Sequence, residues 1–302
     1  MSSLPVSSAC SGCCSAMPAL PDGGFFKSHR PKVMGNLDPY LGRDVAGVVA
    51  NYVTSGVDIF DAAAWKKTWG YAVGPDLEFS EKGQKFWFGL DRCNKDETKK
   101  VYAYEIHLPP VLCPEYVIDP KAGRKEDFTL EKFGEMIQHP QVGAHLSRYR
   151  WPDTKALRQY VKKISDEPAH YIVPRKDGVL FRGQSSANQI ESMKKLNAET
   201  GAEYEVELSI RDVVIPVLAY NALWGTRYLG DATGMEGSHT YSCCSKTQVK
   251  YDKKTYSAVV GGLSPVTTDA LGEASGGLTV GNSSRFNCGH YGMWGLRKFY
   301  GD

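Results

Sequence analysis

Apolar residues recur every three to four positions in six segments of the chain, and this spacing predicts amphipathic helices. Thr129 is placed to cap one of these helices, and Gly201 is placed to end another. Pro216 lies inside the last segment, where a helix is strained or begins. The predicted helices are Asp38–Gly56, Phe60–Trp69, Thr129–Gln138, Asp153–Ile164, Ser186–Thr200 and Ile210–Leu223.

Runs of aromatic and β-branched residues predict strands in other parts of the chain. Near the C-terminus, Ser264–Ser284 is rich in Gly, Ser, Thr and Asn, which predicts a polar loop held on a scaffold of strands. We expect burial at Ala258–Gly262 and at Trp294–Phe299. The predicted strands are Lys85–Leu90, Val101–Leu108, two runs around a Lys176-Asp177-Gly178 turn, Ser257–Leu263, Gly277–Val280 and Trp294–Phe299.

This order of elements favours an α+β fold. Residues 1–35 have few large apolar side chains and many Ser, Cys, Pro and Gly, so we expect a disordered tail. Residues 36–70 form a separate helical segment, and residues 71–302 are expected to form a single α+β domain.

The chain has 302 residues, of which 42% are hydrophobic and 23% are charged, with a net charge of +2. These values are typical of a globular protein and give no electrostatic reason to expect a nucleic-acid partner. The longest apolar run, Val213–Tyr220, is far shorter than the roughly 20 residues that a membrane span needs. No membrane span is therefore expected.

Eight cysteines are irregularly spaced, and the first residues lack the pattern of a signal peptide. We therefore expect mostly free thiols in a reducing compartment. Cys10, Cys13 and Cys14 have zinc-like spacing, but no second Cys or His pair follows nearby. A disordered tail is favoured there over a metal site, and neither a metal nor a cofactor is expected.

Three further residues invite catalytic interpretations. Cys288 and His290 lie two positions apart, a spacing that rarely brings sulfur and imidazole together, so a thiol nucleophile would need another histidine such as His239. His107 lies in an alternating apolar run, which favours a packed or hydrogen-bonded histidine over a catalytic base.

The sharpest short motif is VLFRGQSS at residues 179–186, which resembles the first motif of arginine-type ADP-ribosyltransferases. The resemblance implies that Arg182 holds the phosphates of NAD, a role that suits the guanidinium geometry. The later motifs of that family are poorly matched, since YSCCS at 241–245 and Glu273 are the nearest candidates. The alternative is that Arg182 is a structural surface residue.

The helical segment at residues 36–70 resembles an F-box, whose apolar face docks on an adaptor of ubiquitin ligases. The alternative is a plain helical hairpin packed on the main domain. The residues that would dock on the adaptor are Leu41, Val45, Val48 and Tyr52.

The C-terminal third resembles formylglycine-generating-enzyme-like proteins. AETGAEYEVELSIRDVV at 198–214 matches a turn of that family, and YSAVVGGL, GGLTV and WGLRKF match its terminal strands. The resemblance implies a C-type-lectin-like (sulfatase-modifying-factor-like) domain after an N-terminal helical segment. The catalytic cysteine pair of the family is not reproduced, because only Cys288 lies in the terminal loops. The likeness therefore implies the fold more than the oxidase activity.

A wider likeness, over residues 58–299, is to an uncharacterised paralogous family of environmental chlamydiae that infect amoebae. It is carried by DAAAWKKTWG, FTLEKFGEMIQHPQVG, PAHYIVPRKDGV and VVGGL followed by WGLRKF. The likeness implies variable C-terminal loops on a common frame. The chain also has a Ser-rich, acid-poor start, which is common in proteins exported by bacterial contact-dependent secretion. Together these features lead us to expect an effector made in the bacterial cytoplasm and secreted into the host cytoplasm.

These observations lead us to expect a non-catalytic binding protein for a protein or glycan ligand, with an NAD-dependent transferase, a thiol oxidase and a ubiquitin-ligase adaptor as alternatives. The ligand is expected at the C-terminal loops, through Thr267, Asp269, Glu273, Asn282, Ser284 and Arg285.

Overall fold

The computed structural model describes most of the chain from residue 59 onward, and the statements below concern this part. The predicted tail and the predicted helix Asp38–Gly56 lie outside it. The described residues are 59–89, 91, 101–138, 149–150, 155–163, 167–224, 228–229, 240–251, 253–268, 274–283 and 291–301.

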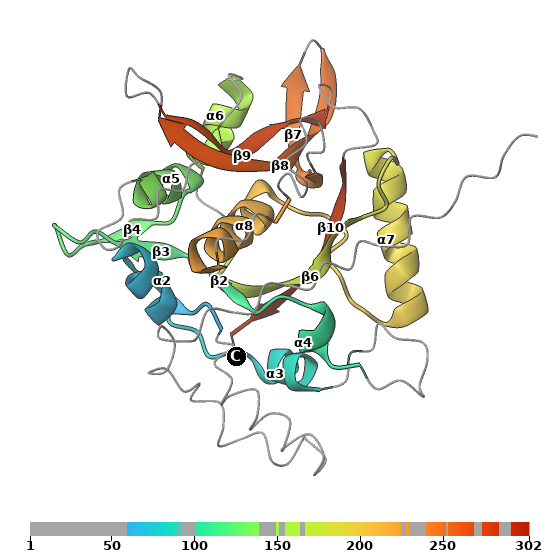
Figure 1. The fold of residues 1–302 in the computed structure, drawn as a ribbon, viewed down its shortest axis with the longest axis horizontal. Coiled ribbons are helices and arrows are strands. Elements are labelled where there is room, and N and C mark those ends of the chain that lie inside the picture. The colour runs from blue at the N-terminus through green and yellow to red at the C-terminus, as the bar shows by residue number, and fades with distance from the viewer. Residues whose placement is uncertain are drawn as a thin grey trace, which may run out of the picture.

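The largest element is a seven-stranded sheet that curls around one helix (Figure 1). Neighbouring strands are antiparallel, except that β10 runs parallel to β7 and β5 runs parallel to β9. The order across the sheet is β2 (Val111–Cys113), β6 (His170–Leu180), β10 (Tyr291–Tyr300), β7 (Tyr241–Tyr251), β8 (Lys254–Thr268), β9 (Ala274–Asn282) and β5 (Tyr149–Arg150).

Helix α8 (Ile210–Trp224) lies at the centre of this curl and contacts β2, β6, β7, β8 and β9 (Figure 1). Its residues 210–220 are all buried, as expected for a helix that is apolar on every side. Pro216 lies within the helix. Because α8 is enclosed, the side chains of its first turn lie inside the molecule.

The other helices cover the outside of the sheet and the ends of the curl. A small sheet of β1 (Ala72–Gly74), β3 (Tyr116–Ile118) and β4 (Lys125–Asp127) lies near α2 and α5 (Figure 1). Helix α7 packs on β10, on the side of the sheet away from α8 (Figure 1). These helices are α2 (Ala62–Trp69), α3 (Glu81–Phe88), α4 (Ala103–Ile106), α5 (Leu130–Gln138), α6 (Lys155–Val161) and α7 (Ser186–Thr200).

An aromatic cluster joins α2 to α5. The rings of Trp65 and Trp69 lie 4.7 Å apart, and both rings contact Phe133. The indole N–H of Trp65 donates to the carbonyl of Leu112 in β2, at 3.0 Å. The predicted helix over Phe60–Trp69 is thus confirmed over Ala62–Trp69, with both tryptophans buried on one face.

Several other predicted elements are confirmed. Thr129 accepts a hydrogen bond from Lys132 N–H at the start of α5, and Gly201 ends α7 in the left-handed conformation. The segments expected to be buried, Ala258–Gly262 and Trp294–Phe299, are buried apart from Lys298, which is partly exposed as a whole residue although its side chain is buried. The predicted α+β class is confirmed.

Other predictions were wrong. Lys85–Leu90 and Val101–Leu108 were predicted as strands, but the structure has α3 and the single turn α4 there. A short aromatic run can form the buried face of a strand or of a helix, so the pattern alone does not decide between them. At α3 the hydroxyl of Ser80 caps the helix by accepting from Gly83 N–H. The Lys176-Asp177-Gly178 turn is not a hairpin turn, because β6 continues through it as one strand.

The predicted polar loop Ser264–Ser284 is also wrong over most of its length. Strand β8 continues to Thr268 and β9 begins at Ala274, so the ribbon remains paired from Ala258↔Asn282 to Thr268↔Ala274. The prediction rested on the many Ser, Thr and Gly residues of this segment. Strands pair through their backbone groups, so a segment with few apolar side chains can still form a strand. Among the described helices, none combines the length and apolar character needed to cross a membrane.

Candidate functional site

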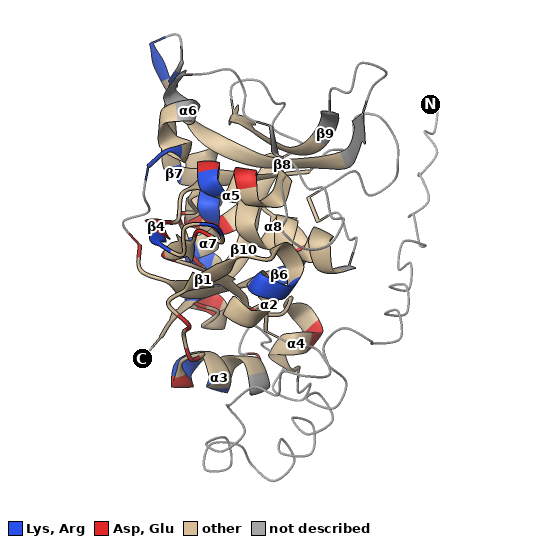
Figure 2. Cartoon of the chain, turned by 90° about the vertical axis from the view of Figure 1, so that its left-hand side faces the viewer, with Lys and Arg blue, Asp and Glu red and all other residues tan. Residues whose placement is uncertain are grey.

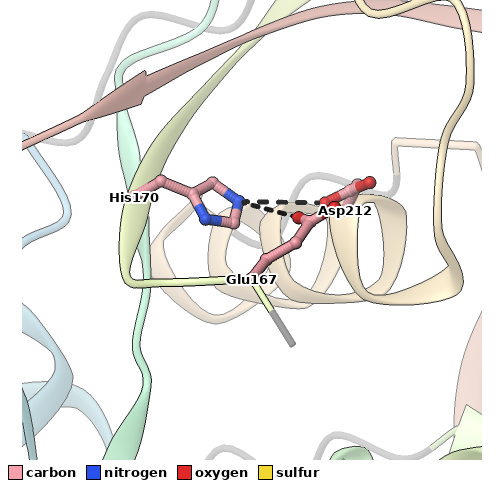
Figure 3. Close-up of side chains that lie close together, drawn as sticks. All are labelled: Glu167, His170 and Asp212. Atoms are coloured by element: carbon pink, nitrogen blue, oxygen red, sulfur yellow. Dashed lines mark ion pairs between the residues drawn. The ribbon is translucent and has the colours of Figure 1, made fainter. Parts of the chain in front are cut away.

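Five ionisable side chains gather where the start of β6, the end of β10 and the first turn of α8 meet. We call them the charge cluster. Figure 3 shows three of them, with the imidazole of His170 directed at the two carboxylates. The members are Glu167, His170, Asp212, Lys246 and Lys298.

Asp212 is held by the start of α8. The backbone N–H of Ser209 donates to Asp212 Oδ2 at 2.8 Å, and the backbone N–H of Asp212 donates to Ser209 Oγ at 3.3 Å. This reciprocal pair is a capping box, which satisfies N–H groups that a helix leaves unpaired at its start. It also fixes the carboxylate so that Oδ1 faces the rest of the cluster.

Lys298 enters the cluster from β10. Its ammonium lies 2.9 Å from Asp212 Oδ1 and 2.6 Å from Glu167 Oε2, so it bridges the two carboxylates. The other oxygen of Glu167, Oε1, lies 2.5 Å from Lys246 Nζ of β7. Each acid is therefore paired with at least one ammonium.

His170 is oriented by its own backbone segment. Nδ1 lies 2.8 Å from the carbonyl oxygen of Pro168, which can only accept, so Nδ1 carries a proton and donates. Nε2 faces Asp212 Oδ1 at 3.8 Å and Glu167 Oε2 at 4.0 Å, and it has no hydrogen-bond partner among the described residues. The ring thus points an unsatisfied nitrogen at two anionic oxygens.

The electrostatics follow from burial and from these contacts. Burial alone would lower the pKa of His170, but Asp212 and the thiol of Cys113 raise that pKa to about 9. Burial opposes the ionised form of Asp212, yet His170 and Lys298 hold its pKa well below the ordinary value. Burial also opposes the charge of Lys298, and Asp212 and Glu167 raise its pKa above the ordinary value. In the metal-free chain the cluster is thus fully ionised.

The cluster is buried at its centre and reaches solvent at one side. The side chains of His170 and Asp212 are 0% exposed and that of Lys298 is 1% exposed, whereas Glu167 is 22% and Lys246 is 42% exposed. An imidazole and two carboxylates are oxygen and nitrogen ligands suited to a transition-metal ion. Their ligand atoms lie within 4.8 Å of one another. The same groups also form a self-neutralised ion-pair network without any metal.

A second buried histidine, His107, lies in a network of a different kind. Its Nδ1 donates to the carbonyl oxygen of Ala103 at 3.0 Å, and its Nε2 therefore accepts from the hydroxyl of Tyr204 at 3.0 Å. The same hydroxyl oxygen accepts from Arg175 Nη1 at 3.2 Å. Burial lowers the pKa of His107 to about 4, so the ring is neutral. This matches the prediction of a packed, hydrogen-bonded histidine.

The residues predicted from sequence are distributed differently. Arg182 lies exposed in the turn between β6 and α7, and Thr267 lies in β8. Asn282, expected at a ligand surface, lies at the end of β9 and is 0% exposed. The predicted residues outside the described part of the chain are Leu41, Val45, Val48, Tyr52, Asp269, Glu273, Ser284, Arg285, Cys288 and His290.

The YSCCS run at 241–245 forms the start of β7. Cys243 and Cys244 are both fully buried, and burial raises the pKa of each thiol. Buried thiols with raised pKa values are poor nucleophiles. Neither cysteine therefore has the properties of a catalytic residue.

Sequence reasoning missed the charge cluster. His170 falls in a predicted strand, Asp212 in a predicted helix and Lys298 in a predicted terminal strand, and Glu167 falls in no predicted element. A local signal existed only at Ser209 and Asp212, whose spacing is that of a capping box. No family model, no curated protein and no solved structure matches the chain.

Proposed function

We propose that the protein is a non-catalytic binding protein in which the curled sheet around α8 is the scaffold and the ribbon of β8 and β9 contacts the ligand. The observation that carries this proposal is the composition of the ribbon. No Lys, Arg, Asp or Glu occurs from Thr255 to Thr268 or from Ala274 to Asn282. In Figure 2 the course of β8 correspondingly lacks both charge colours over most of its length, whereas α3 shows both.

A charge-free ribbon is suited to binding because charged residues are depleted at the centre of protein interfaces. One part of the ribbon is anchored, since Val259, Val260, Leu278 and Val280 are 0% exposed. The backbone pairing continues beyond this anchor to Thr267↔Ser275 and Thr268↔Ala274. This end of the ribbon is where we propose that a protein or glycan ligand binds.

Two further parts of the proposal rest on sequence resemblance. The assignment of the scaffold to the C-type-lectin-like class rests on the likeness of residues 198–299. The proposal that the protein is an effector released into a host cytoplasm rests on the likeness to the chlamydial family. The F-box-like adaptor function stays a prediction, because its docking residues lie outside the described part of the chain.

The test is a matched pair of substitutions on one strand. Thr267→Arg places a charge at the proposed ligand end of β8, and Thr255→Arg places the same charge at the other, exposed end. Immobilised wild-type and variant chains are exposed to amoeba lysate and, separately, to a glycan array. We expect the wild type and Thr255→Arg to retain equal amounts of a true ligand, and Thr267→Arg to retain at least tenfold less of it. Equal retention by all three chains contradicts the proposal.

A second candidate function, NAD-dependent ADP-ribosyl transfer, is favoured by one observation. Ser186, the last residue of VLFRGQSS, has its hydroxyl 3.2 Å from Cys243 Sγ in β7 and 3.0 Å from Ser257 Oγ in β8. The Arg182 turn and the YSCCS strand therefore lie together, as the resemblance requires. Saturation-transfer NMR with NAD tests this candidate. A signal that is lost in Arg182→Ala supports it, and no signal from the wild type removes it.

A further inference from the structure

We propose that Glu167, His170 and Asp212 bind one divalent transition-metal ion of the zinc class, which takes the place of the Lys298 ammonium. Three different parts of the chain supply the ligand atoms: the segment before β6, the first residue of β6 and the first turn of α8. These atoms lie within 4.8 Å of one another. The site is independent of the proposed ligand-binding ribbon.

The first line of argument is the unsatisfied nitrogen of His170. A buried polar atom without a hydrogen bond is rare and requires an explanation, and an ion is one such explanation. His170 is fully buried, and Nε2 is directed at Asp212 Oδ1 and Glu167 Oε2 (Figure 3). Distances of 3.8 and 4.0 Å are too long for hydrogen bonds. Distances of this size are closer to those between two ligand atoms of one metal ion than to those between a hydrogen-bond donor and its acceptor.

The second line of argument is how the ligands are held from behind. A metal-binding histidine almost always donates its other ring N–H to a carbonyl or carboxylate, which orients the ring. His170 Nδ1 donates in this way to the carbonyl of Pro168 at 2.8 Å. Asp212 Oδ2 is likewise held by Ser209 N–H at 2.8 Å, which leaves Oδ1 for the ion.

The third line of argument is that a cation already occupies this position. Lys298 Nζ lies 2.6 Å from Glu167 Oε2 and 2.9 Å from Asp212 Oδ1. For a divalent ion to bind, the Nε2 proton of His170 must be released to solvent and the Lys298 ammonium must move away from the carboxylates. The two charges of the ion then replace the two positive charges, of the imidazolium and the ammonium, that now lie beside Asp212 and Glu167. With metal–ligand bonds of about 2.0–2.2 Å, the imidazole and carboxylates would draw together by roughly half an ångström. Glu167, which is partly exposed beside Lys246, is the side from which an ion can enter.

The donor set selects the class of metal. One imidazole and two carboxylates suit zinc, cobalt, iron and manganese rather than the softer copper(I), which prefers thiolates and thioethers. Calcium takes six to eight oxygen ligands, more than this cluster offers. Three protein ligands leave at least one position of the metal for water or a further ligand.

The test is titration of the full chain with Co²⁺, followed by displacement with Zn²⁺. Cobalt absorption separates this site from sites at cysteines, because thiolate ligands add a charge-transfer band that imidazole and carboxylate ligands lack. We expect one equivalent of Co²⁺ to bind without that band. His170→Gln and Asp212→Asn should each lower the affinity at least tenfold, whereas Glu191→Gln, on the exposed face of α7, should not change it.

Lys298→Met provides the second measurement, because it removes the competing ammonium without removing a ligand. We expect it to bind Co²⁺ at least tenfold more tightly than the wild type, and circular dichroism confirms that each variant is folded. Cobalt binding that is unchanged in folded His170→Gln would overturn the proposal. Binding by Lys298→Met but not by the wild type would overturn it equally, since the ammonium would then exclude the metal in the natural chain.

Discussion

The ammonium of Lys298 is expected to be one of the most important single groups for the stability of this protein. Replacing Lys298 by Met keeps most of the aliphatic length but leaves Asp212 and Glu167 facing each other across a buried space. The side chain of Asp212 is 0% and that of Lys298 is 1% exposed, so the carboxylate of Asp212 would be poorly solvated without the ammonium. Breaking a buried ion pair by removing one partner costs about 3–5 kcal/mol. We expect a loss of this size in the free energy of unfolding.

Lys246→Met is the matched control. It removes an ammonium from the same Glu167, but Lys246 is 42% exposed. Exposed ion pairs contribute about 0–1 kcal/mol, so this loss should be small. Both variants are compared with the wild type by urea denaturation at pH 7, with a chelator present to keep the chains free of metal.

The pH dependence gives the reasoning a second check. In the wild type, Lys298 and His170 hold the pKa of Asp212 low, so the stability from this carboxylate is present at neutral pH and is lost as the pH falls. Without Lys298, the folded-state pKa values of the two carboxylates rise, because burial and mutual repulsion then favour protonation. The difference between wild type and Lys298→Met should therefore shrink from pH 7 towards pH 4. Equal losses in the two variants, or a difference that does not change with pH, would refute the argument.

Three further predictions concern other parts of the structure. Burial lowers the pKa of His107 to about 4 in the folded chain, so as the pH falls this histidine is protonated in the unfolded chain before it is protonated in the folded one. About 3 kcal/mol of stability should therefore be lost between pH 6.5 and pH 4. His107→Gln should remove that slope in denaturant titrations, and an unchanged slope would contradict it. Gly261→Ala should lower the melting temperature by more than 5 °C, roughly the effect of 2 kcal/mol in a chain of this size, because its Cβ would lie 2.0 Å from the carbonyl oxygen of Thr240. Ser185→Ala should cost about 1 kcal/mol through loss of the cap on Asn188 N–H, whereas Ser185→Asp should retain most of the wild-type stability in the same assay.

Two of the correctly predicted helices carried an explicit end signal in the sequence. Thr129 and Gly201 are capping residues, and both helices they bound lie within a residue of the predicted limits. The failures lie in short aromatic runs of six to eight residues, where the apolar pattern does not separate a strand from a helix. Lys85–Leu90 has only six residues, and its burial in α3 is decided by packing of Phe86 on Phe299, which is more than 200 positions away. Such packing has no local signature.

The charge cluster was unpredictable for a related reason. Its members come from positions 167, 170, 212, 246 and 298, and only the curl of the sheet brings them together. Each residue type is ordinary in its local setting, because charged residues are normally solvated. A buried charge becomes informative only when the partner is known, and here the partners lie on a helix, on three strands and in the segment before β6. By contrast, the charge-free composition of the ribbon is visible in the sequence. Parts of it were predicted as strands, but Ser264–Ser284 was interpreted as a loop.

The last strand shows what the charged residues contribute beyond stability. Lys298 lies opposite Ile172 of β6 and serves the cluster on one face of β10. The adjacent Arg297 serves the other face, where its guanidinium lies 2.6 Å from Glu203 and over the ring of Phe86. A slip of one residue would turn each side chain to the opposite face. A slip in one direction would put Leu296 in the place of Arg297, and a slip in the other would put Phe299 in the place of Lys298. Either slip would leave the acids of one face without a cation.

The apolar residues of β10 would resist such a slip only weakly. Its sequence around the cations is apolar on both sides, with Leu296 and Phe299 both buried, so neither face is distinguished by hydrophobicity alone. The two faces differ instead in their ion pairs, because Arg297 pairs with Glu203 on one face and Lys298 pairs with Glu167 and Asp212 on the other. We therefore expect the ion pairs on the two faces of β10, the third of the seven strands of its sheet, to favour the observed register over a slip of one residue.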